Sequence, residues 1–314
     1  MLKKILITGG AGYLGSMIST KLVELGHEVT VIDNLIYSKD SLLHLFQYNN
    51  FKFIEGDATD KKKIKKLLRF KDIIIPLAAL VGASLCEKKK KLSKKINVDA
   101  IKMICKFSNK EQKIIFLTTN SGYGIGEKDK FCDEKSLLRP VSWYGITKNN
   151  AEKIILERGN QVSFRLATVF GYSFRMRTDL LVNYMTLEMF RKKKIKIFEP
   201  QFRRNFIHIN DVVRAIIFTI NNFKKLKNNI YNLGLSDANI TKFQLAEKIN
   251  YILGNKSMIQ IVHKIKDPDQ RDYYVSNKKI EKKGFFASTS LENGIRELIK
   301  IYKINTFQKY KNNY

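Results

Sequence analysis

The sequence predicts an α/β protein: a doubly wound parallel sheet with helices on both faces, and a second, smaller α/β region. Three observations predict this fold. Short β-branched runs alternate with helical patterns through roughly the first 120 residues, as in parallel sheets whose strands are joined by helices. A glycine-rich segment joins the first strand to the first helix. The 314 residues are 44% hydrophobic, which suffices for one large or two moderate cores.

The elements follow from the spacing of apolar residues. Runs rich in Ile, Val and Phe predict strands, at Lys4–Thr8, Glu28–Asp33, Lys52–Gly56, Asp72–Ala78 and Lys113–Thr118. Helical spacing between these runs predicts helices, at Gly15–Leu25, Ser41–Gln47, Lys61–Arg69 and Leu92–Ser108. Later segments predict helices at Tyr144–Arg158, Asp179–Lys192, Lys242–Leu253 and Leu291–Tyr302, and strands at Gln161–Arg165 and Tyr231–Leu233. The polar tail Asn305–Tyr314 is expected to fray.

The composition limits the classes of partner. Lys and Arg number 58 against 29 acids, a net charge of +29 that would suit nucleic acid or an anionic membrane. The lysines are spread along the whole chain without interleaved aromatic residues, so solvated lysine faces are favoured over a nucleic-acid surface. The longest apolar run, Ile73–Val81, is about half of a membrane span.

The cysteines and the first residues indicate a cytoplasmic, soluble protein without a metal site. Cys86, Cys105 and Cys132 form neither a disulfide framework nor a zinc-binding spacing. The first apolar run ends at Gly9, well short of the roughly 7–15 residues of an export core.

The glycine-rich segment predicts a dinucleotide site. Gly9, Gly12 and Gly15 follow the first strand and open the first helix. In such a loop one glycine permits the turn, one lets the backbone approach a diphosphate, and one lets the helix pack on the strand. The diphosphate then meets the unpaired N–H groups of the helix N-terminus.

Residues at later strand ends suit the same ligand. Asp33 ends the second strand, where a carboxylate accepts hydrogen bonds from the adenosine ribose and repels a 2′-phosphate, which indicates NAD over NADP. Asp57 ends the third strand and can meet the adenine amino group. Leu77, Ala78 and Ala79 end the fourth strand with small residues where the backbone can approach the cofactor.

A catalytic set is predicted around Tyr144. Tyr144 and Lys148 lie four residues apart on one helix face. The lysine ammonium and the positive nicotinamide both favour a phenolate, so we expect the Tyr144 pKa to be lowered towards neutrality and Tyr144 to act as a base for a sugar hydroxyl. A hydroxyl at the end of the fifth strand, from Thr118 or Thr119, would complete the set.

Together these residues resemble the extended short-chain dehydrogenase/reductases that act on nucleotide sugars. The similarity also includes Asn97, Tyr123-Gly124, Arg165, Arg204-Asn205-Phe206-Ile207-His208, Asn232-Leu233-Gly234 and Arg271. It implies a Rossmann-type NAD-binding domain over 1–171 plus 209–237 and a nucleotide-sugar domain over 172–208 plus 238–304. It implies catalysis by Thr119, Tyr144 and Lys148. NAD would be bound by Gly9, Gly12, Tyr13, Leu14, Gly15, Asp33, Asn34, Asp57, Ala58, Leu77, Ala78, Ala79, Asn97, Thr118, Tyr144 and Lys148.

The substrate half carries much of the arginine. Seven of the 12 arginines lie between Arg158 and Arg204, where a planar fork could grip a diphosphate. The resemblance implies that substrate is bound by Thr119, Asn120, Ser121, Thr168, Arg175, Arg177, Asn183, Arg204 and Arg271. It also implies a homodimer, in which the helices Leu92–Ser108 and Tyr144–Arg158 pair into a four-helix bundle.

Departures from the family narrow the reaction. The family's 4,6-dehydratases carry Asp-Glu after the catalytic Thr, whereas this chain has Asn120-Ser121, which disfavours loss of water. Pro76 replaces a usual His, and Thr168 a frequent Asn.

Segments 74–83, 120–127 and 267–273 are similar to family members that oxidise C4 of a GDP-linked manno-heptose for capsule polysaccharide. We therefore expect C4 oxidation of such a sugar, with 4-epimerisation as the alternative. A binding protein without chemistry would not need the Tyr144/Lys148 pair, and an RNA-binding derivative is suggested by the charge alone.

Overall fold

A seven-stranded parallel sheet organises the larger part of the molecule. The structure, a computed structural model, describes residues 1–127, 130–262 and 271–304. Within them the strand order is β11-β7-β5-β4-β1-β2-β3, and every neighbouring pair is parallel. The bounds are β1 Lys4–Thr8, β2 Glu28–Asp33, β3 Phe51–Glu55, β4 Ile73–Pro76, β5 Lys113–Thr119, β7 Gln161–Leu166 and β11 Asn229–Leu233. The predicted fold class is confirmed.

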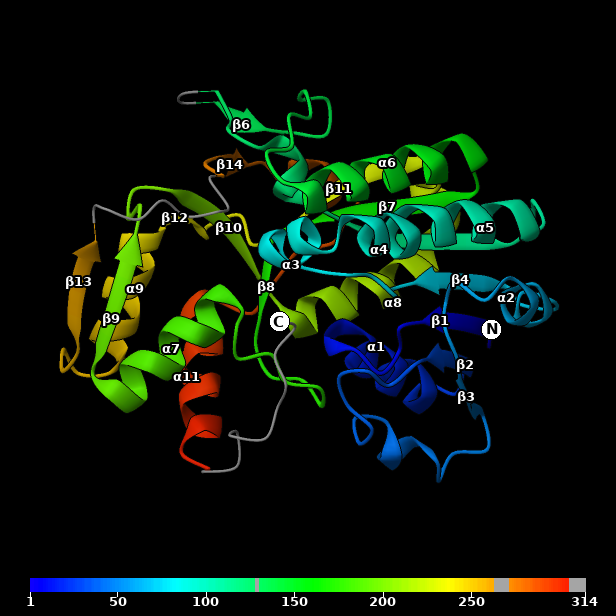
Figure 1. The fold of residues 1–314 in the computed structure, drawn as a ribbon, viewed down its shortest axis with the longest axis horizontal. Helices are drawn as coiled ribbons and strands as arrows, with labels where there is room; N and C mark the ends of the chain where they lie inside the picture. Colours follow the sequence, from blue (N-terminus) through cyan, green and yellow to red (C-terminus); the bar gives the residue numbers. More distant parts are fainter. Residues whose placement is uncertain (128–129, 263–270, 305–314) are drawn as a thin grey trace.

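The sheet is buried on both faces because side chains alternate along each strand. Ile5 and Ile7 of β1 pack with α1 (Tyr13–Glu24) and α8 (Ile209–Leu226) on one face. Leu6 faces the opposite way and packs with α2 (Lys61–Leu67), α5 (Ala100–Phe107) and α6 (Trp143–Arg158). Figure 1 shows these helices on either side of the sheet. Buried strands of this kind read as continuous apolar runs, which is why the sequence predicted them.

The strand order opens a crevice where the chain reverses direction. From β1 the chain proceeds outwards through β2 and β3 on one side, then returns to add β4 and the later strands on the other. Ligands of doubly wound sheets bind outside the carboxyl ends of the strands at such a point. The glycine-rich loop after β1 and the residues that follow β4 and β5 meet there.

A second core lies beside the large sheet, on the left in Figure 1. Helices α7, α9 and α11 surround its apolar residues, among them Met185, Leu245 and Leu298. Its strands form small sheets, β12-β10-β8 and β13-β9, and a further pair, β14-β6, lies near the carboxyl edge of the large sheet. The bounds are β6 Phe131–Cys132, β8 Thr168–Phe170, α7 Leu181–Lys192, β9 Lys194–Phe198, β10 Arg203–His208, β12 Asn239–Thr241, α9 Lys242–Ile252, β13 Met258–Val262, β14 Tyr274–Val275, α10 Lys278–Glu281 and α11 Leu291–Tyr302.

The domain boundaries stay a proposal. Residues from 170–206 and 235–302 make up the second core, close to the division expected from the sequence. Ile280 and Phe285, however, pack in the core of the large sheet, although the sequence assigned them to the smaller domain.

Several predicted elements differ from the observed ones. The helix expected at Ser41–Gln47 is a single 3₁₀ turn, Leu43–Leu45, because Leu42 and Leu45 are the buried residues and a three-residue turn places both on one side. The helix expected at Leu92–Ser108 is divided into α4 (Lys90–Lys94), a π-helical turn (Lys95–Asp99) and α5. A helix preceding it, α3 (Ala83–Lys88), was not predicted, and neither was α8. The tail Asn305–Tyr314 lies outside the described residues.

Candidate active site

Two glycines of the loop after β1, Gly9 and Gly15, leave no room for a side chain. Gly9 has a φ of +72°, and a Cβ there would lie 2.5 Å from the backbone nitrogen of Ala78. A Cβ on Gly15 would lie 2.2 Å from the Gly9 carbonyl oxygen, so β1, the loop and α1 pack backbone against backbone. Gly12 caps α1 without a side chain, and the first turn of α1 carries no acidic residue. The N–H groups of that turn are therefore suited to an anionic diphosphate.

Tyr13 and Leu14 contribute to this loop through the backbone at the start of α1. The side chain of Tyr13 turns away from it, and its hydroxyl donates to the backbone oxygen of Gly171 at 2.8 Å. The assignment of Tyr13 to the cofactor therefore applies to its backbone N–H.

Asp33 lies next to the glycine loop at the end of β2. Its carboxylate accepts hydrogen bonds from the backbone N–H groups of Ala11 and Leu35, each at 2.9 Å. Burial raises the pKa of Asp33, and these backbone hydrogen bonds oppose that rise. A carboxylate has about four lone pairs, so acceptor capacity remains for a ribose hydroxyl. Asn34 and Asp57 are exposed at neighbouring strand ends, and Ala58 is buried beside Asp57.

The segment after β4 is held by Asn97. Leu77 continues from the strand with its N–H bonded to the Thr8 oxygen at 2.9 Å, and Ala78 and Ala79 follow, half-buried. The buried Asn97 amide accepts from Leu80 N–H at 2.8 Å and donates to the Leu80 oxygen at 3.0 Å and the Thr147 hydroxyl at 3.1 Å. Asn97 thus positions the backbone that borders the cofactor crevice, because its polar atoms are bonded within the protein.

The predicted catalytic residues gather at the end of β5. Ser142 caps α6 by accepting the Gly145 N–H at 3.2 Å, which sets Tyr144 in the first turn and Lys148 one turn later. Thr119, the last residue of β5, lies close enough to Tyr144 to lower its pKa, and its hydroxyl lies 2.9 Å from the Ser121 hydroxyl. Lys148 is 6% exposed and makes no hydrogen bond to another described residue, while its ammonium lies 4.5 Å from the centroid of the Phe116 ring.

Burial dominates the electrostatics of Tyr144. It raises the pKa of Tyr144 to about 12, and the nearby Arg271 and Arg177 only partly oppose that rise. Burial also lowers the pKa of Lys148 to about 8. The expected lowering of the Tyr144 pKa depends on the positive nicotinamide as well as on Lys148, and it stays a prediction.

Buried polar atoms without a partner flank Thr119 in the chain. In the described part of the chain, the Thr118 hydroxyl and both amide atoms of Asn120 are buried and make no hydrogen bond. Buried polar groups are nearly always satisfied, so these atoms suit a bound ligand. Ser121 contacts the Arg271 guanidinium.

The substrate residues expected from the sequence separate into two groups. Arg271 and Arg177 are close enough to Tyr144 to lower its pKa, and Arg204 donates to the backbone oxygens of Arg203 and Arg271. Thr168 lies half-buried in β8. Arg175 instead lies near Asp33, with its guanidinium 4.7 Å from the centroid of the Tyr37 ring.

Asn183 supports the loop between β8 and α7. Its amide accepts the Gly171 N–H at 3.0 Å and donates to the Arg177 oxygen at 2.8 Å. The side chain is fully buried, and its expected contact with the substrate stays a prediction.

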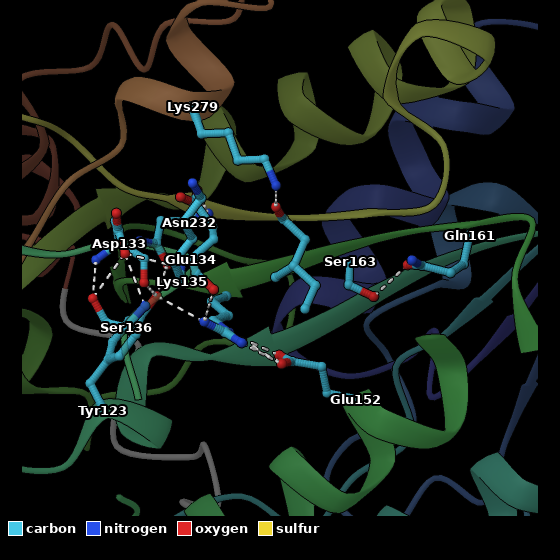
Figure 2. Close-up of polar contacts among 12 residues, drawn as sticks. Tyr123, Asp133, Glu134, Lys135, Ser136, Glu152, Gln161, Ser163, Asn232 and Lys279 are labelled. Carbon is cyan, nitrogen blue, oxygen red and sulfur yellow. Dashed lines mark hydrogen bonds and ion pairs between the residues drawn. The ribbon is translucent and has the colours of Figure 1, made fainter. Parts of the chain in front are cut away.

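A buried ion pair that the sequence did not indicate as functional supports the catalytic helix. The guanidinium of Arg165 in β7 lies 2.7 Å from the Glu152 carboxylate of α6, with both side chains about 95% buried or more. Arg165 also donates to the Tyr123 hydroxyl at 3.1 Å, which donates to Asn232 at 2.6 Å. In Figure 2, Glu152 lies at one end of this group of polar contacts, and Tyr123, Glu134 and Asn232 lie together at the opposite end. The spacing of Tyr144, Lys148 and Glu152 by four residues was the available signal.

Two classes of feature are absent from the described residues. No helix among them is long and apolar enough to cross a membrane. The same residues include no group of three His, Cys, Asp or Glu side chains that could hold a metal ion.

A glycine loop, an acid at the end of β2 and a Tyr/Lys pair beside unsatisfied polar atoms together define an enzyme that uses a dinucleotide. Residues 5–234 match the model of the NAD dependent epimerase/dehydratase family, and the chain belongs to that family. NAD is therefore its cofactor, and the cradle without Cβ atoms and the Asp33 carboxylate fit it.

The relatives carry out different reactions. The chain is 26% identical over 99% of its length to the dTDP-D-glucose 4,6-dehydratase of Homo sapiens, of which it covers 92%. It is 26% identical over 96% of its length to the UDP-N-acetyl-alpha-D-glucosaminuronate decarboxylase of Bacillus cytotoxicus, of which it covers 98%. A UDP-glucose 4-epimerase of Thermotoga maritima, solved with UDP-glucose, is similar in structure with a TM-score of 0.85, 25% identity and coverage of 96% of this chain and 99% of that one.

Proposed function

We propose that the protein uses NAD to oxidise the C4 hydroxyl of a nucleotide-activated sugar. The observation that carries this proposal is the grouping of Thr119, Tyr144 and Lys148 beside the unsatisfied atoms of Thr118 and Asn120. The relatives act on nucleotide sugars, as their names state, which supports the substrate class.

In this proposal Tyr144 takes the proton of the C4 hydroxyl and Thr119 hydrogen-bonds the same oxygen. When bound, NAD⁺ accepts the C4 hydrogen with its electron pair and adds a positive charge to the site. Burial raises the pKa of Tyr144 to about 12 and so disfavours the phenolate. Arg271, Arg177 and Thr119 oppose this rise and favour the phenolate. Lys148, with a pKa of about 8, keeps most of its charge at pH 7, and in this proposal it donates to a hydroxyl of the cofactor ribose.

Loss of water is disfavoured in this proposal. Elimination needs an acid to protonate the departing hydroxyl, and Asn120 and Ser121 carry no carboxyl group where the family's dehydratases have Asp-Glu.

The finer proposal is a GDP-linked manno-heptose as substrate, for a surface polysaccharide. It is supported by segments 74–83, 120–127 and 267–273, of which 267–270 lie outside the described residues. The second candidate is a 4-epimerase, in which the keto sugar turns and takes hydride back on its other face. The similarity to a UDP-glucose 4-epimerase favours this candidate.

A substrate panel separates the candidates. Purified protein and NAD are incubated with GDP-manno-heptose and with UDP-, GDP-, CDP- and dTDP-hexoses, and the products are reduced with borodeuteride. Dehydrogenation predicts NADH absorbance and deuterium at C4. Interconversion of two sugars at C4 without a trapped keto product would contradict the first candidate.

Tyr144→Phe tests the assigned base in the same assay. We expect turnover to fall by about 10²- to 10⁴-fold because proton transfer is lost, while NAD still binds. Tyr184→Phe on α7, where the side chain is 43% exposed, is the matched control and should keep full activity. If Tyr144→Phe keeps most of its turnover, the base lies elsewhere.

A homodimer is also part of the proposal. Leu92 and Leu156, on α4 and α6, are 41% and 37% exposed, and pairing of these helices between two copies would cover them. Light scattering at micromolar concentration measures the mass, and a monomer would contradict the assignment.

A further inference from the structure

The end of the large sheet opposite the candidate site has surface features that the proposed function does not use. Because all seven strands are parallel, their amino ends share one edge, and their carboxyl ends, with Thr119 and the glycine loop, share the other. In Figure 1 the N-terminus and α2 lie at the right-hand end, on the far side of the large sheet from the second core. We call the surface at this edge the amino face, formed by residues 2–4, 25–28, 49–52, 66–72, 110–113 and 224–227.

Large apolar side chains project into solvent from the amino face. Phe70 is 87% exposed and Leu2 is 66% exposed, and Leu25 is also exposed. The Leu2 side chain approaches the residue that follows Leu25. The Lys4 N–H donates to the Asp72 carboxylate at 2.8 Å, and the Asp72 N–H donates back to the Lys4 oxygen at 2.8 Å, so the turn that carries Phe70 lies next to the start of β1. These apolar side chains therefore lie near the same strand ends.

Folding does not account for the phenylalanine at position 70. Its φ of +61° is a backbone conformation that favours glycine, so Phe70 is held there at a cost. A ring exposed this far also contributes little apolar burial to the folded state. Single exposed apolar residues are ordinary on protein surfaces, whereas several on one face indicate an interaction site.

Cations crowd the same face. Burial lowers the pKa of Lys113, and Lys3 and Lys224 are close enough to lower it further, although Asp72 opposes them. Within the described residues these three lysines form no ion pair. The fold therefore brings together like charges from β1, β5 and the end of α8, and an anionic partner would relieve their repulsion.

A polar cavity of about 340 Å³ opens on the amino face between β2, β3 and the end of α2. Its charged lining residues are Lys52, Lys66, Arg69, Lys71 and Glu28. Glu28 is already shared by two lysines, Lys71 at 3.6 Å and Lys4 at 3.7 Å. Lys52, Lys66 and Arg69 form no ion pair in the described part of the chain. The cavity is therefore suited to an anionic group such as a phosphate.

We propose that the amino face binds an anionic membrane surface, with Phe70, Leu2 and Leu25 inserted among the lipids and the surrounding cations in contact with lipid phosphates. Apolar side chains within a basic surround match the bilayer interface, where acyl chains lie beneath anionic head groups. A nucleic acid would engage the cations but would leave Leu2 and Leu25 exposed to water. The carboxyl edge, with Thr119 and the cofactor crevice, then faces away from the bilayer. The proposal is independent of the sugar and of the reaction at C4.

The test measures binding to vesicles and not turnover. The full chain is sedimented with vesicles of phosphatidylcholine containing about one-third phosphatidylglycerol, and with vesicles of phosphatidylcholine alone, at physiological ionic strength. Phe70→Ser removes an apolar side chain without changing the charge, and the double variant Lys52→Gln/Arg69→Gln removes two cations of the cavity.

Matched controls lie on the second core, away from the amino face. Tyr251→Ser on α9 removes an aromatic side chain that is 70% exposed. The double variant Lys248→Gln/Lys300→Gln removes two exposed cations from α9 and α11. Circular dichroism and NAD binding verify that every variant is folded.

The proposal predicts that the wild type binds the mixed vesicles and not the neutral ones. Phe70→Ser should weaken binding to mixed vesicles by about 10-fold, as for the loss of one large buried apolar side chain. Lys52→Gln/Arg69→Gln should weaken it by about 25-fold, at about fivefold for each cation near an anionic surface. Both controls should bind as the wild type does.

Three results would overturn the proposal. The first is equal binding to vesicles of phosphatidylcholine alone, or no binding to the mixed vesicles. The second is an unchanged affinity of Phe70→Ser. The third is an equal loss in Lys248→Gln/Lys300→Gln, which would assign binding to the overall charge. Salt-dependent binding of a single-stranded RNA, measured by fluorescence anisotropy, without binding to mixed vesicles would identify nucleic acid as the partner instead.

Discussion

Replacing Lys148 by Met should make the cofactor-free protein more stable while it weakens NAD binding. Lys148 is 6% exposed, makes no hydrogen bond to another described residue, and has the Phe116 ring as a close neighbour at 4.5 Å. Burying this ammonium costs folding free energy, which the nearby Glu152 carboxylate offsets in part and a bound ligand can offset further. Met has a similar length and no charge, so it can fill the same space.

The magnitude follows from the pKa of Lys148. Burial lowers it from 10.5 to about 8, which at 1.36 kcal/mol per pH unit corresponds to about 3 kcal/mol of destabilisation when the group is charged. Loss of the contact with the Phe116 ring returns about 1 kcal/mol. We therefore expect Lys148→Met to raise the free energy of unfolding by about 2 kcal/mol at pH 7.

The sign of the pH dependence identifies the cause. Below pH 8 the folded and unfolded chains both hold the proton, so the wild type bears the full cost. Between pH 8 and 10.5 only the unfolded chain holds it, and the stability of the wild type therefore rises with pH. The advantage of Lys148→Met should shrink across this interval and disappear above it.

Urea unfolding at pH 7, 9 and 10.5, followed by circular dichroism, measures the difference. Lys153→Met, on the exposed side of the same helix, is the control and should be neutral at every pH. Saturating NAD should reverse the order, because a ligand at 100 times its Kd adds about 2.7 kcal/mol to a protein that binds it. A Lys148→Met protein less stable than the wild type at pH 7, or a gain independent of pH, would refute the reasoning.

Two further substitutions test the cofactor site and its support. Asp33→Ala should narrow the preference for NAD over NADP, because the carboxylate that repels a 2′-phosphate is removed; the ratio of the two Kd values measures this, and a wild type that prefers NADP would contradict the assignment. Glu152→Gln should lower the free energy of unfolding by about 3 kcal/mol, since it leaves the buried Arg165 without its anion. The exposed pair of Glu292 and Arg296 is the comparison: Glu292→Gln should cost less than about 1 kcal/mol, and equal effects would mean that burial does not matter here.

Local patterns were enough to predict the large sheet and the cofactor. β1 and β2 have the bounds expected from the sequence, because a strand buried on both faces must be a continuous apolar run. The glycine spacing and Asp33 predicted NAD. Each of these signals lies in a short segment of the chain, the loop between β1 and α1 or the end of β2, so it can be recognised without the tertiary structure. The short strands of the second core carried a weaker signal: β9 alternates buried and exposed residues over only five positions.

The roles of individual polar residues depended on contacts between distant segments. Asn97 and Asn183 appear in the sequence as candidate ligands, but their amides are bonded to Leu80 and to Gly171, respectively, which only the folded chain brings near. Arg175 is close in sequence to Arg177, yet its guanidinium lies beside the ring of Tyr37, in a loop whose Gly171 and Ser173 are hydrogen-bonded to Tyr13 of α1.

The sequence by itself therefore determined the class of fold and the cofactor, because both are indicated by residue spacing within short segments of the chain. Only the tertiary structure decided which of the predicted site residues lie together and how far burial shifts their pKa values. The pKa of Tyr144 shows the reason most clearly. Its value reflects how much solvent the surrounding elements exclude, and burial raises it to about 12 although Lys148 lies one turn away.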